Sequence, residues 1–113
     1  RPKLGNLMGG LSGPSLKPIA LRMAYQCARA TNIPVIGCGG ISTAEDVLEF
    51  LIAGATAVQV GTATFVNPAI MPKIIADLEA WLSREGYASV REVIGTVIDG
   101  EQKEGVVFME AAP

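Results

Sequence analysis

The sequence contains no histidine, only two cysteines in 113 residues, and few aromatic side chains. The lack of histidine excludes, within this chain, any mechanism in which an imidazole moves a proton or binds a metal ion. Cys27 and Cys38 are too few for a disulfide framework and do not have the spacing of metal ligands. We therefore expect neither a disulfide-rich domain nor a metal centre.

Long apolar runs and a strong charge of either sign are also missing. No apolar stretch reaches the length of about 20 residues that crosses a membrane, and no signal peptide is visible. The formal net charge of −2 gives no basic surface on which a nucleic acid would bind. These absences predict a cytoplasmic protein that has neither a membrane nor a nucleic acid as its partner.

The sequence is otherwise apolar and rich in glycine. Half of the residues are hydrophobic and thirteen are glycine, which is typical of an α/β protein and not of a disordered chain. The chain is nevertheless short for a closed α/β barrel, which needs about 250 residues.

The middle of the sequence predicts one βαβ unit. An apolar run at Ile33–Ile36 predicts a strand that is buried on both faces. Ser42 and Glu45 then have the spacing of a capping box at a helix start, and Gly54 is expected to end that helix. A second strand is expected over residues 57–60, and a crossover of this kind makes the two strands parallel.

Glycines follow both predicted strands. Gly39 and Gly40 come after the first strand, and Gly61 with Thr62 comes after the second. Ligands of parallel α/β folds bind at the carboxyl ends of the strands, and glycine lets backbone N–H groups approach a phosphate closely. The alternative is a pair of ordinary tight turns. Two such turns on neighbouring strands, one of them before a capped helix, favour a phosphate site.

Helices are expected on both sides of this unit. The first covers about residues 15–30, the next follows Asn67 as N-cap and Pro68 and runs to about residue 84, and a short one covers residues 89–98. Apolar side chains at helical spacing are expected to face the core. They are Leu16, Ile19, Met23 and Cys27 with Ala20 and Ala24 beside them, then Val47, Leu48, Leu51 and Ile52, and finally Ile74, Ile75, Leu78 and either Trp81 or Leu82. Residues 99–113 have no clear period and form a tail of uncertain structure.

Two parallel strands alone would both be sheet edges, which is not a stable arrangement. Either the α/β chain is part of a larger barrel or it pairs with another segment, and we expect a part of a larger barrel.

Three motifs resemble one family. They are the run Gly9–Pro14 followed by Lys17 and Pro18, the run Ile36–Ile41, and Gly61-Thr62-Ala63. In this order they resemble the carboxyl-terminal part of dihydroorotate dehydrogenase, over about residues 7–98. The run from Gly61 through Pro68 and Pro72 to Ile75 is most similar to the NAD-linked class 1B branch.

The resemblance implies that the chain is the carboxyl-terminal part of a (β/α)8 TIM barrel, with about its last two strands and three helices. It also implies that this barrel carries FMN and oxidises dihydroorotate to orotate in pyrimidine biosynthesis. It implies that residues 1–98 are the part of this barrel that binds FMN, with the cofactor-binding positions Gly13, Gly39, Gly40, Gly61 and Thr62. It also implies a homodimer and an iron–sulfur and FAD subunit that passes electrons to NAD.

The family's catalytic cysteine and its orotate ligands lie on segments that this sequence does not contain, so we expect no catalytic residue here and an inactive fragment. Cys38 does not match that cysteine and is expected to be buried and structural. Lys17 either approaches the flavin phosphate or is a solvated charge, and Ser12 either binds ligand or caps the first helix. Two other functions stay open, the related domain of a dihydropyrimidine dehydrogenase and a non-catalytic half-barrel that binds phosphates.

Overall fold

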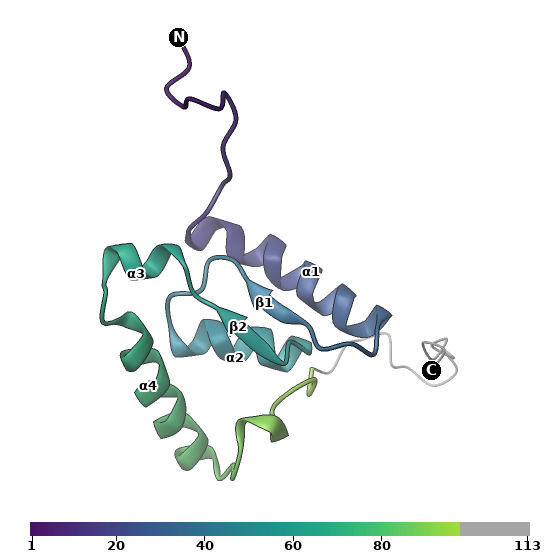
Figure 1. The fold of residues 1–113 in the computed structure, drawn as a ribbon. Helices are drawn as coiled ribbons and strands as arrows, with labels where there is room; N and C mark the ends of the chain where they lie inside the picture. Colours follow the sequence, from purple (N-terminus) through teal and green to yellow (C-terminus); the bar gives the residue numbers. More distant parts are fainter. Residues whose placement is uncertain (98–113) are drawn as a thin grey trace.

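The computed structural model describes residues 1–97. Their helices and strands alternate along the chain (Figure 1) in the order η1 (Pro14–Leu16), α1 (Lys17–Ala30), β1 (Ile36–Cys38), α2 (Ala44–Ala53), β2 (Ala57–Gln59), α3 (Thr62–Val66), α4 (Ile70–Glu85) and η2 (Val90–Glu92). None of the helices in these residues is both long and apolar enough to cross a membrane.

The two strands confirm the predicted βαβ unit. β1 and β2 pair in parallel, with Ile36 opposite Ala57 and Cys38 opposite Gln59. β1 begins three residues later than predicted and includes the first glycine of the turn. Pro34 explains the late start, because a proline has no N–H to give to a strand ladder.

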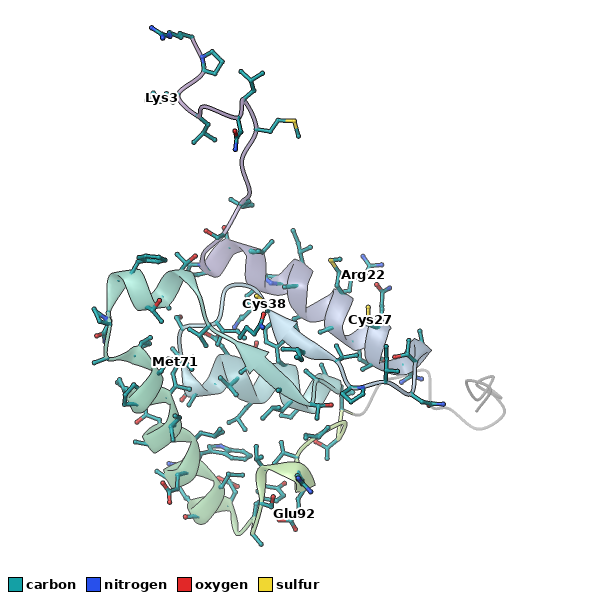
Figure 2. All side chains as sticks on the ribbon, viewed as in Figure 1. Lys3, Arg22, Cys27, Cys38, Met71 and Glu92 are labelled. Atoms are coloured by element: carbon teal, nitrogen blue, oxygen red, sulfur yellow. The ribbon has the colours of Figure 1, made fainter. Side chains whose placement is uncertain are left out.

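The prediction that β1 is buried on both faces is wrong for the described residues. Its burial alternates, with Gly37 covered while Ile36 and Cys38 on the other face are exposed. α1 packs on β1 and α2 packs on β2, so the helices cover one face of the sheet and leave the other open (Figure 1). Cys38, expected to be buried, therefore lies on the open face (Figure 2).

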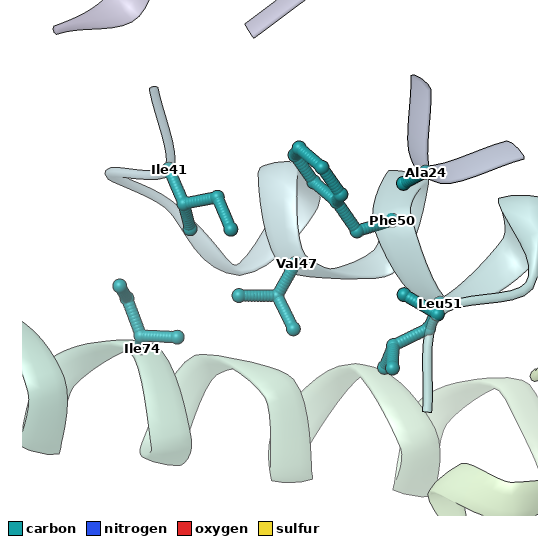
Figure 3. Close-up of a cluster of buried hydrophobic side chains, with 7 residues drawn as sticks. Ala24, Ile41, Val47, Phe50, Leu51 and Ile74 are labelled. Atoms are coloured by element: carbon teal, nitrogen blue, oxygen red, sulfur yellow. The ribbon is translucent and has the colours of Figure 1, made fainter. Parts of the chain in front are cut away.

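The core lies between the covered face of the sheet and the helices α1, α2 and α4. Phe50 on α2 is its centre, because its side chain is fully buried and a Cβ at Gly37 would overlap its ring. Figure 3 shows Phe50 extending from α2 on the side of Ala24, whereas Val47 and Leu51 extend toward α4, which contributes Ile74. The predicted positions Val47 and Leu51 are buried as expected, but the stripe read from the sequence omitted Phe50.

The start of α2 differs from the prediction by one residue. Thr43, not Ser42, is the N-cap, and its partner in the capping box is Asp46 and not Glu45. The predicted end is confirmed, since Gly54 caps the helix with φ of 118°. The last turn of α2 also receives bonds from the end of the described chain, where the N–H groups of Gly95 and Val97 donate to the carbonyls of Leu51 and Ile52 at 2.9 and 3.2 Å.

Only the small residues of the predicted α1 face enter the core. Ile19, Met23 and Cys27 are exposed, whereas Ala24 is buried and Ala20 packs beside it. Small side chains let α1 lie close to the glycine loops. A Cβ at Gly39 would be 2.7 Å from the Cβ of Ala20. The larger apolar residues point away from this close contact, and the predicted burial of Cys27 is wrong.

The chain after β2 contains one more helix than predicted. Thr62 starts the short helix α3, and Asn67 lies in the turn to α4, where its side chain accepts a hydrogen bond from the N–H of Ala69. Asn67 is therefore not the N-cap of α4, which is Ala69. α4 ends at Gly86 as predicted, and Ile74 is buried.

Two predictions for the last helices need correction. Ile75, expected to face inward, is mostly exposed on α4. Ser89 does cap a helix, in a capping box with Glu92, but η2 ends at Glu92. The predicted tail over residues 99–113 lies outside the described residues.

Candidate functional site

A cavity of about 520 Å³ lies at the carboxyl ends of β1 and β2, within the size range of small-molecule sites. Four segments form its wall. They are the loop that leads into η1 and α1, the loop after β1, the end of β2 with the start of α3, and the turn between α3 and α4. The cavity thus lies where a parallel α/β sheet binds its ligands.

All five residues predicted to bind a cofactor line this cavity. Gly13 comes from the loop before α1, Gly39 and Gly40 from the loop after β1, and Gly61 and Thr62 from the junction of β2 and α3. Their positions in the sequence are up to about fifty residues apart, so only the fold brings them together. The sequence did not identify Gln59 and Asn67, which also line the cavity.

Gly40 holds two of these loops in contact. Its φ is +71°, and a Cβ at this position would lie 2.7 Å from the backbone N of Lys17 and 2.9 Å from the carbonyl O of Gly13. Both neighbours are backbone atoms that cannot rotate away. Glycine is therefore required here for the loop after β1 to pack against the start of α1.

Gly61 differs, because the fold itself does not require a glycine there. Its φ is −114°, which any residue can adopt, and a Cβ would meet nothing within 4 Å. Gly61 nevertheless lines the cavity, so a side chain at this position would occupy space that a ligand can otherwise reach.

Backbone N–H groups are the available donors of the two glycine turns. Outside the helices and the strand ladder of residues 1–97, no hydrogen bond uses the N–H of Gly39, Gly40 or Gly61. N–H groups on successive residues of a glycine turn are a common way to bind an anion.

Asp46 and Lys17 form a charged cluster behind the cavity wall. The Lys17 Nζ lies 2.6 Å from Asp46 Oδ1 and 2.9 Å from Glu49 Oε2. The other carboxylate oxygen of Asp46 accepts hydrogen bonds from the N–H groups of Ser42 and Thr43, at 2.9 and 3.1 Å, and from the Ser42 hydroxyl. Lys17 is thus an ion-paired, partly exposed charge, and it is not among the residues that line the cavity.

These contacts favour the charged forms of both Lys17 and Asp46 and shift their pKa values accordingly. Hydrogen bonds to Asp46 and then Glu49 raise the pKa of Lys17 above its ordinary value. Burial alone would raise the pKa of Asp46, but the hydrogen bonds from Lys17, Ser42 and Thr43 outweigh it and lower that pKa. Both groups are therefore charged at neutral pH.

The cavity itself is almost free of titratable groups. Within the described part of the chain, the thiol of Cys38 is the only such group on its wall, and the other polar side chains there are neutral. No cluster of three potential metal ligands exists in residues 1–97. Ser12 lines the cavity and does not cap η1, whose N-cap is Gly13 without a side-chain bond. The wall is suited to binding and contributes no carboxylate or imidazole for proton transfer.

Comparison with known proteins identifies the family. The sequence profile of the dihydroorotate dehydrogenase family matches residues 1–82. Dihydroorotate dehydrogenase B (NAD(+)), catalytic subunit, from Trichlorobacter lovleyi is 58% identical over 97 residues, which are 86% of this chain and 32% of the relative. The protein of the same name from Bacillus caldolyticus is 60% identical over 95 residues, 84% of this chain and 30% of its own length.

Comparison of the fold with solved structures points to the same family. The crystal structure of ligand-free type DHODH from Eimeria tenella superimposes with a TM-score of 0.72 at 32% identity, over 78% of this chain and 25% of that one. The chain spans about a third of the length of the curated relatives it matches. On its profile match and on its similarity to these relatives, the chain belongs to the dihydroorotate dehydrogenase family.

Proposed function

We propose that the cavity between the glycine loops binds FMN, and that this chain is the FMN-phosphate-binding part of an NAD-linked dihydroorotate dehydrogenase. The protein would oxidise dihydroorotate to orotate in pyrimidine biosynthesis, in the cytoplasm. The observation that carries this proposal is that the predicted residues line one cavity, and that no hydrogen bond outside the helices and the strand ladder of residues 1–97 uses the N–H of Gly39, Gly40 or Gly61. The names of the relatives supply the substrate and the acceptor.

The residues present fit an FMN phosphate. The open space beside Gly61, which a Cβ would enter, gives a phosphate oxygen access to backbone donors. The nearest lysine is already paired with two carboxylates, so the backbone must supply the hydrogen bonds to the anion. Thr62 adds a hydroxyl at the same point. Leu11, Ile41 and Ile70 give the rest of the wall an apolar lining, which suits a flat ring system.

When bound, FMN would accept the hydride equivalent of the substrate, and the residues of this chain would bind and orient it. None of the carboxylates described here lines the cavity, and Asp46 is already bound by Ser42 and Lys17, so none of them is placed to act as the general base. We therefore propose that the base and most substrate contacts lie outside these residues, as the missing family segments imply.

We propose the same partners as the resemblance implies. They are a second copy of the catalytic subunit and an iron–sulfur and FAD subunit that carries electrons to NAD. The printed name of the relatives, a catalytic subunit of an NAD(+) enzyme, supports the existence of a partner subunit. We also propose that the chain forms the last two strands of a (β/α)8 barrel, because its sheet has two edges and an open face within the described residues.

The experiment is an FMN titration of the natural gene product after removal of its flavin, followed by flavin fluorescence. Gly61→Val is expected to weaken FMN binding at least about tenfold while the protein stays folded, because the valine side chain fills space that the ligand needs. Gly10→Val is the matched control, since a Cβ there also meets nothing within 4 Å and Gly10 does not line the cavity. Equal affinity in both variants would refute the proposed position of the phosphate.

Activity then separates this function from the two alternatives. Dihydroorotate should bleach the bound flavin, and NAD should be reduced only when the partner subunit is present. Bleaching by NADPH together with reduction of uracil would indicate a dihydropyrimidine dehydrogenase instead. Saturable phosphate binding without any flavin reduction would support a non-catalytic half-barrel.

A further inference from the structure

The charged cluster behind the cavity joins the two loops that form the proposed phosphate site. Lys17 is the first residue of α1 and is separated from Gly13 only by the three residues of η1. Asp46 belongs to the first turn of α2 and receives the N–H groups of Ser42 and Thr43 from the loop after β1. The 2.6 Å ion pair between them therefore connects two segments that are far apart in the sequence.

We propose that Lys17 and Asp46 are positioning residues that lock the loop before α1 to the loop after β1. This loop lock keeps the backbone groups that bind the cofactor in their relative positions. The inference rests on the proposed FMN site and assigns these two residues a role in forming it. Neither side chain lines the cavity, so both act through the backbone of the loops.

The geometry of Asp46 favours this role over that of a simple helix cap. A cap needs only one side-chain oxygen at the helix start. Asp46 instead divides its two oxygens, with Oδ2 on the loop side toward Ser42 and Thr43, and Oδ1 toward Lys17. Asp46 is only 8% exposed, so these bonds are partly shielded from water, and such shielding strengthens charge-assisted hydrogen bonds.

Gly40 shows why the distance between the two loops must be kept. It lies against the backbone N of Lys17 and the carbonyl O of Gly13, with no space for a Cβ. The ion pair and this glycine contact therefore hold the loops together from two sides. Glu49 adds a second carboxylate to Lys17, but it is about half exposed and makes no bond to either loop.

The test uses Lys17→Met, Lys17→Arg and Asp46→Asn in the natural gene product. Lys73→Met is the matched control for the loss of a lysine, because Lys73 also lies in the first turn of a helix and pairs with a carboxylate, that of Asp77. Glu49→Gln is the control for a carboxylate that contacts Lys17 without contacting a loop. Thermal unfolding of every variant gives the fraction that is folded.

The first readout is amide hydrogen exchange in the flavin-free protein. Asp46→Asn is expected to speed exchange at Ser42 and Thr43 by about tenfold, because their N–H groups lose a charged acceptor. Exchange in α4 should not change. This readout needs no cofactor, so it tests the loop lock even if FMN proves not to be the ligand.

The second readout is the affinity for FMN. Lys17→Met and Asp46→Asn are each expected to weaken it about tenfold, while both controls stay within about twofold. Lys17→Arg should restore most of the affinity, because it keeps a cation that reaches Asp46. A merely stabilising role would lower affinity only in proportion to the unfolded fraction.

The outcomes separate the two proposals. Unchanged exchange at Ser42 and Thr43 in Asp46→Asn would overturn the loop lock. Faster exchange with unchanged FMN affinity would overturn its role in cofactor binding. A wild-type protein that binds no FMN would refute the proposed function and with it the role in FMN binding, and the exchange result would still decide whether the loops are locked.

Discussion

Gly40 and Gly86 have similar backbone angles and different surroundings, which makes them a matched pair at the residue scale. The φ values are +71° and +79°, but a Cβ would overlap backbone atoms at Gly40 and would meet nothing at Gly86. Gly86→Ala should cost about 1 kcal/mol of unfolding free energy from backbone strain alone. Gly40→Ala should cost at least twice as much. Urea unfolding measures both, and equal losses would show that the contact at Gly40 relaxes freely.

Asp46 gives the stability of the protein a dependence on pH. Its pKa is lower in the folded state than the ordinary value of 3.8, so the folded form favours the ionised carboxylate. This contribution is complete above the unfolded pKa and is lost as pH falls through the folded one. The difference in stability between wild type and Asp46→Asn should thus be largest above about pH 5 and shrink below about pH 4. Urea unfolding from pH 3 to pH 7 checks this, and a constant difference would contradict it.

Capping residues show the limit of sequence analysis at this scale. Ser42 and Glu45 have a plausible capping-box spacing, yet Thr43 and Asp46, one residue later, form the box. Both pairs satisfy the same local rule. The choice depends on Lys17, which lies 29 residues earlier and favours a carboxylate at position 46. Local spacing cannot report such a distant partner.

At the scale of elements, the packing of α2 depends on one aromatic residue. Phe50 is fully buried, whereas the ring of Phe65 on α3 is 91% exposed. Phe50→Ala should lower the unfolding free energy by about 3–5 kcal/mol, because it leaves a cavity against Gly37. Phe65→Ala should change it by less than about 0.5 kcal/mol. Urea unfolding compares the pair, and similar losses would mean that Phe65 has a buried partner in the natural protein.

The elements themselves were largely predictable, but their orientation was not. Glycines, caps and apolar runs located the parallel strands and the helix between them. The predicted face of α1 was right only in part, because hydrophobic periodicity gives weight to large residues such as Ile19 and Met23, which are exposed. The real contact uses Ala20 and Ala24, whose small side chains allow close approach to the glycine loop. The size of the side chains, and not their hydrophobicity, decides which face of α1 packs on the glycine loop.

At the scale of the molecule, the open face of the sheet predicts association of the isolated chain. Ile36 is 57% exposed there, and both strands are edges in the described residues. The 113-residue chain expressed alone should self-associate with rising concentration in sedimentation experiments. Ile36→Lys should reduce this association, whereas Ile75→Lys on α4 should not. A monomer with a cooperative thermal transition would contradict the prediction.

The candidate site could be predicted at this scale because it consists of turns. Each of its glycine pairs follows a strand, and parallel strands bring their carboxyl ends to one edge, so Gly39 and Gly61 had to lie near each other. The contributions of Gln59 and Asn67 could not be foreseen, because they depend on which way a strand faces and on where α3 ends. Topology therefore indicates the place of the site and only part of its wall.

The hydrogen bonds that Gly95 and Val97 give to the end of α2 have a consequence during synthesis. The carbonyls of Leu51 and Ile52 receive these bonds only after about forty-five further residues have been translated. At about 5–20 residues per second, the ribosome needs a few seconds to supply them. During this interval the N–H groups of Gly54 and Ala55 cap the helix, and water occupies the acceptors that are left. The carboxyl end of α2 therefore gains its last hydrogen bonds only after residue 97 has been translated.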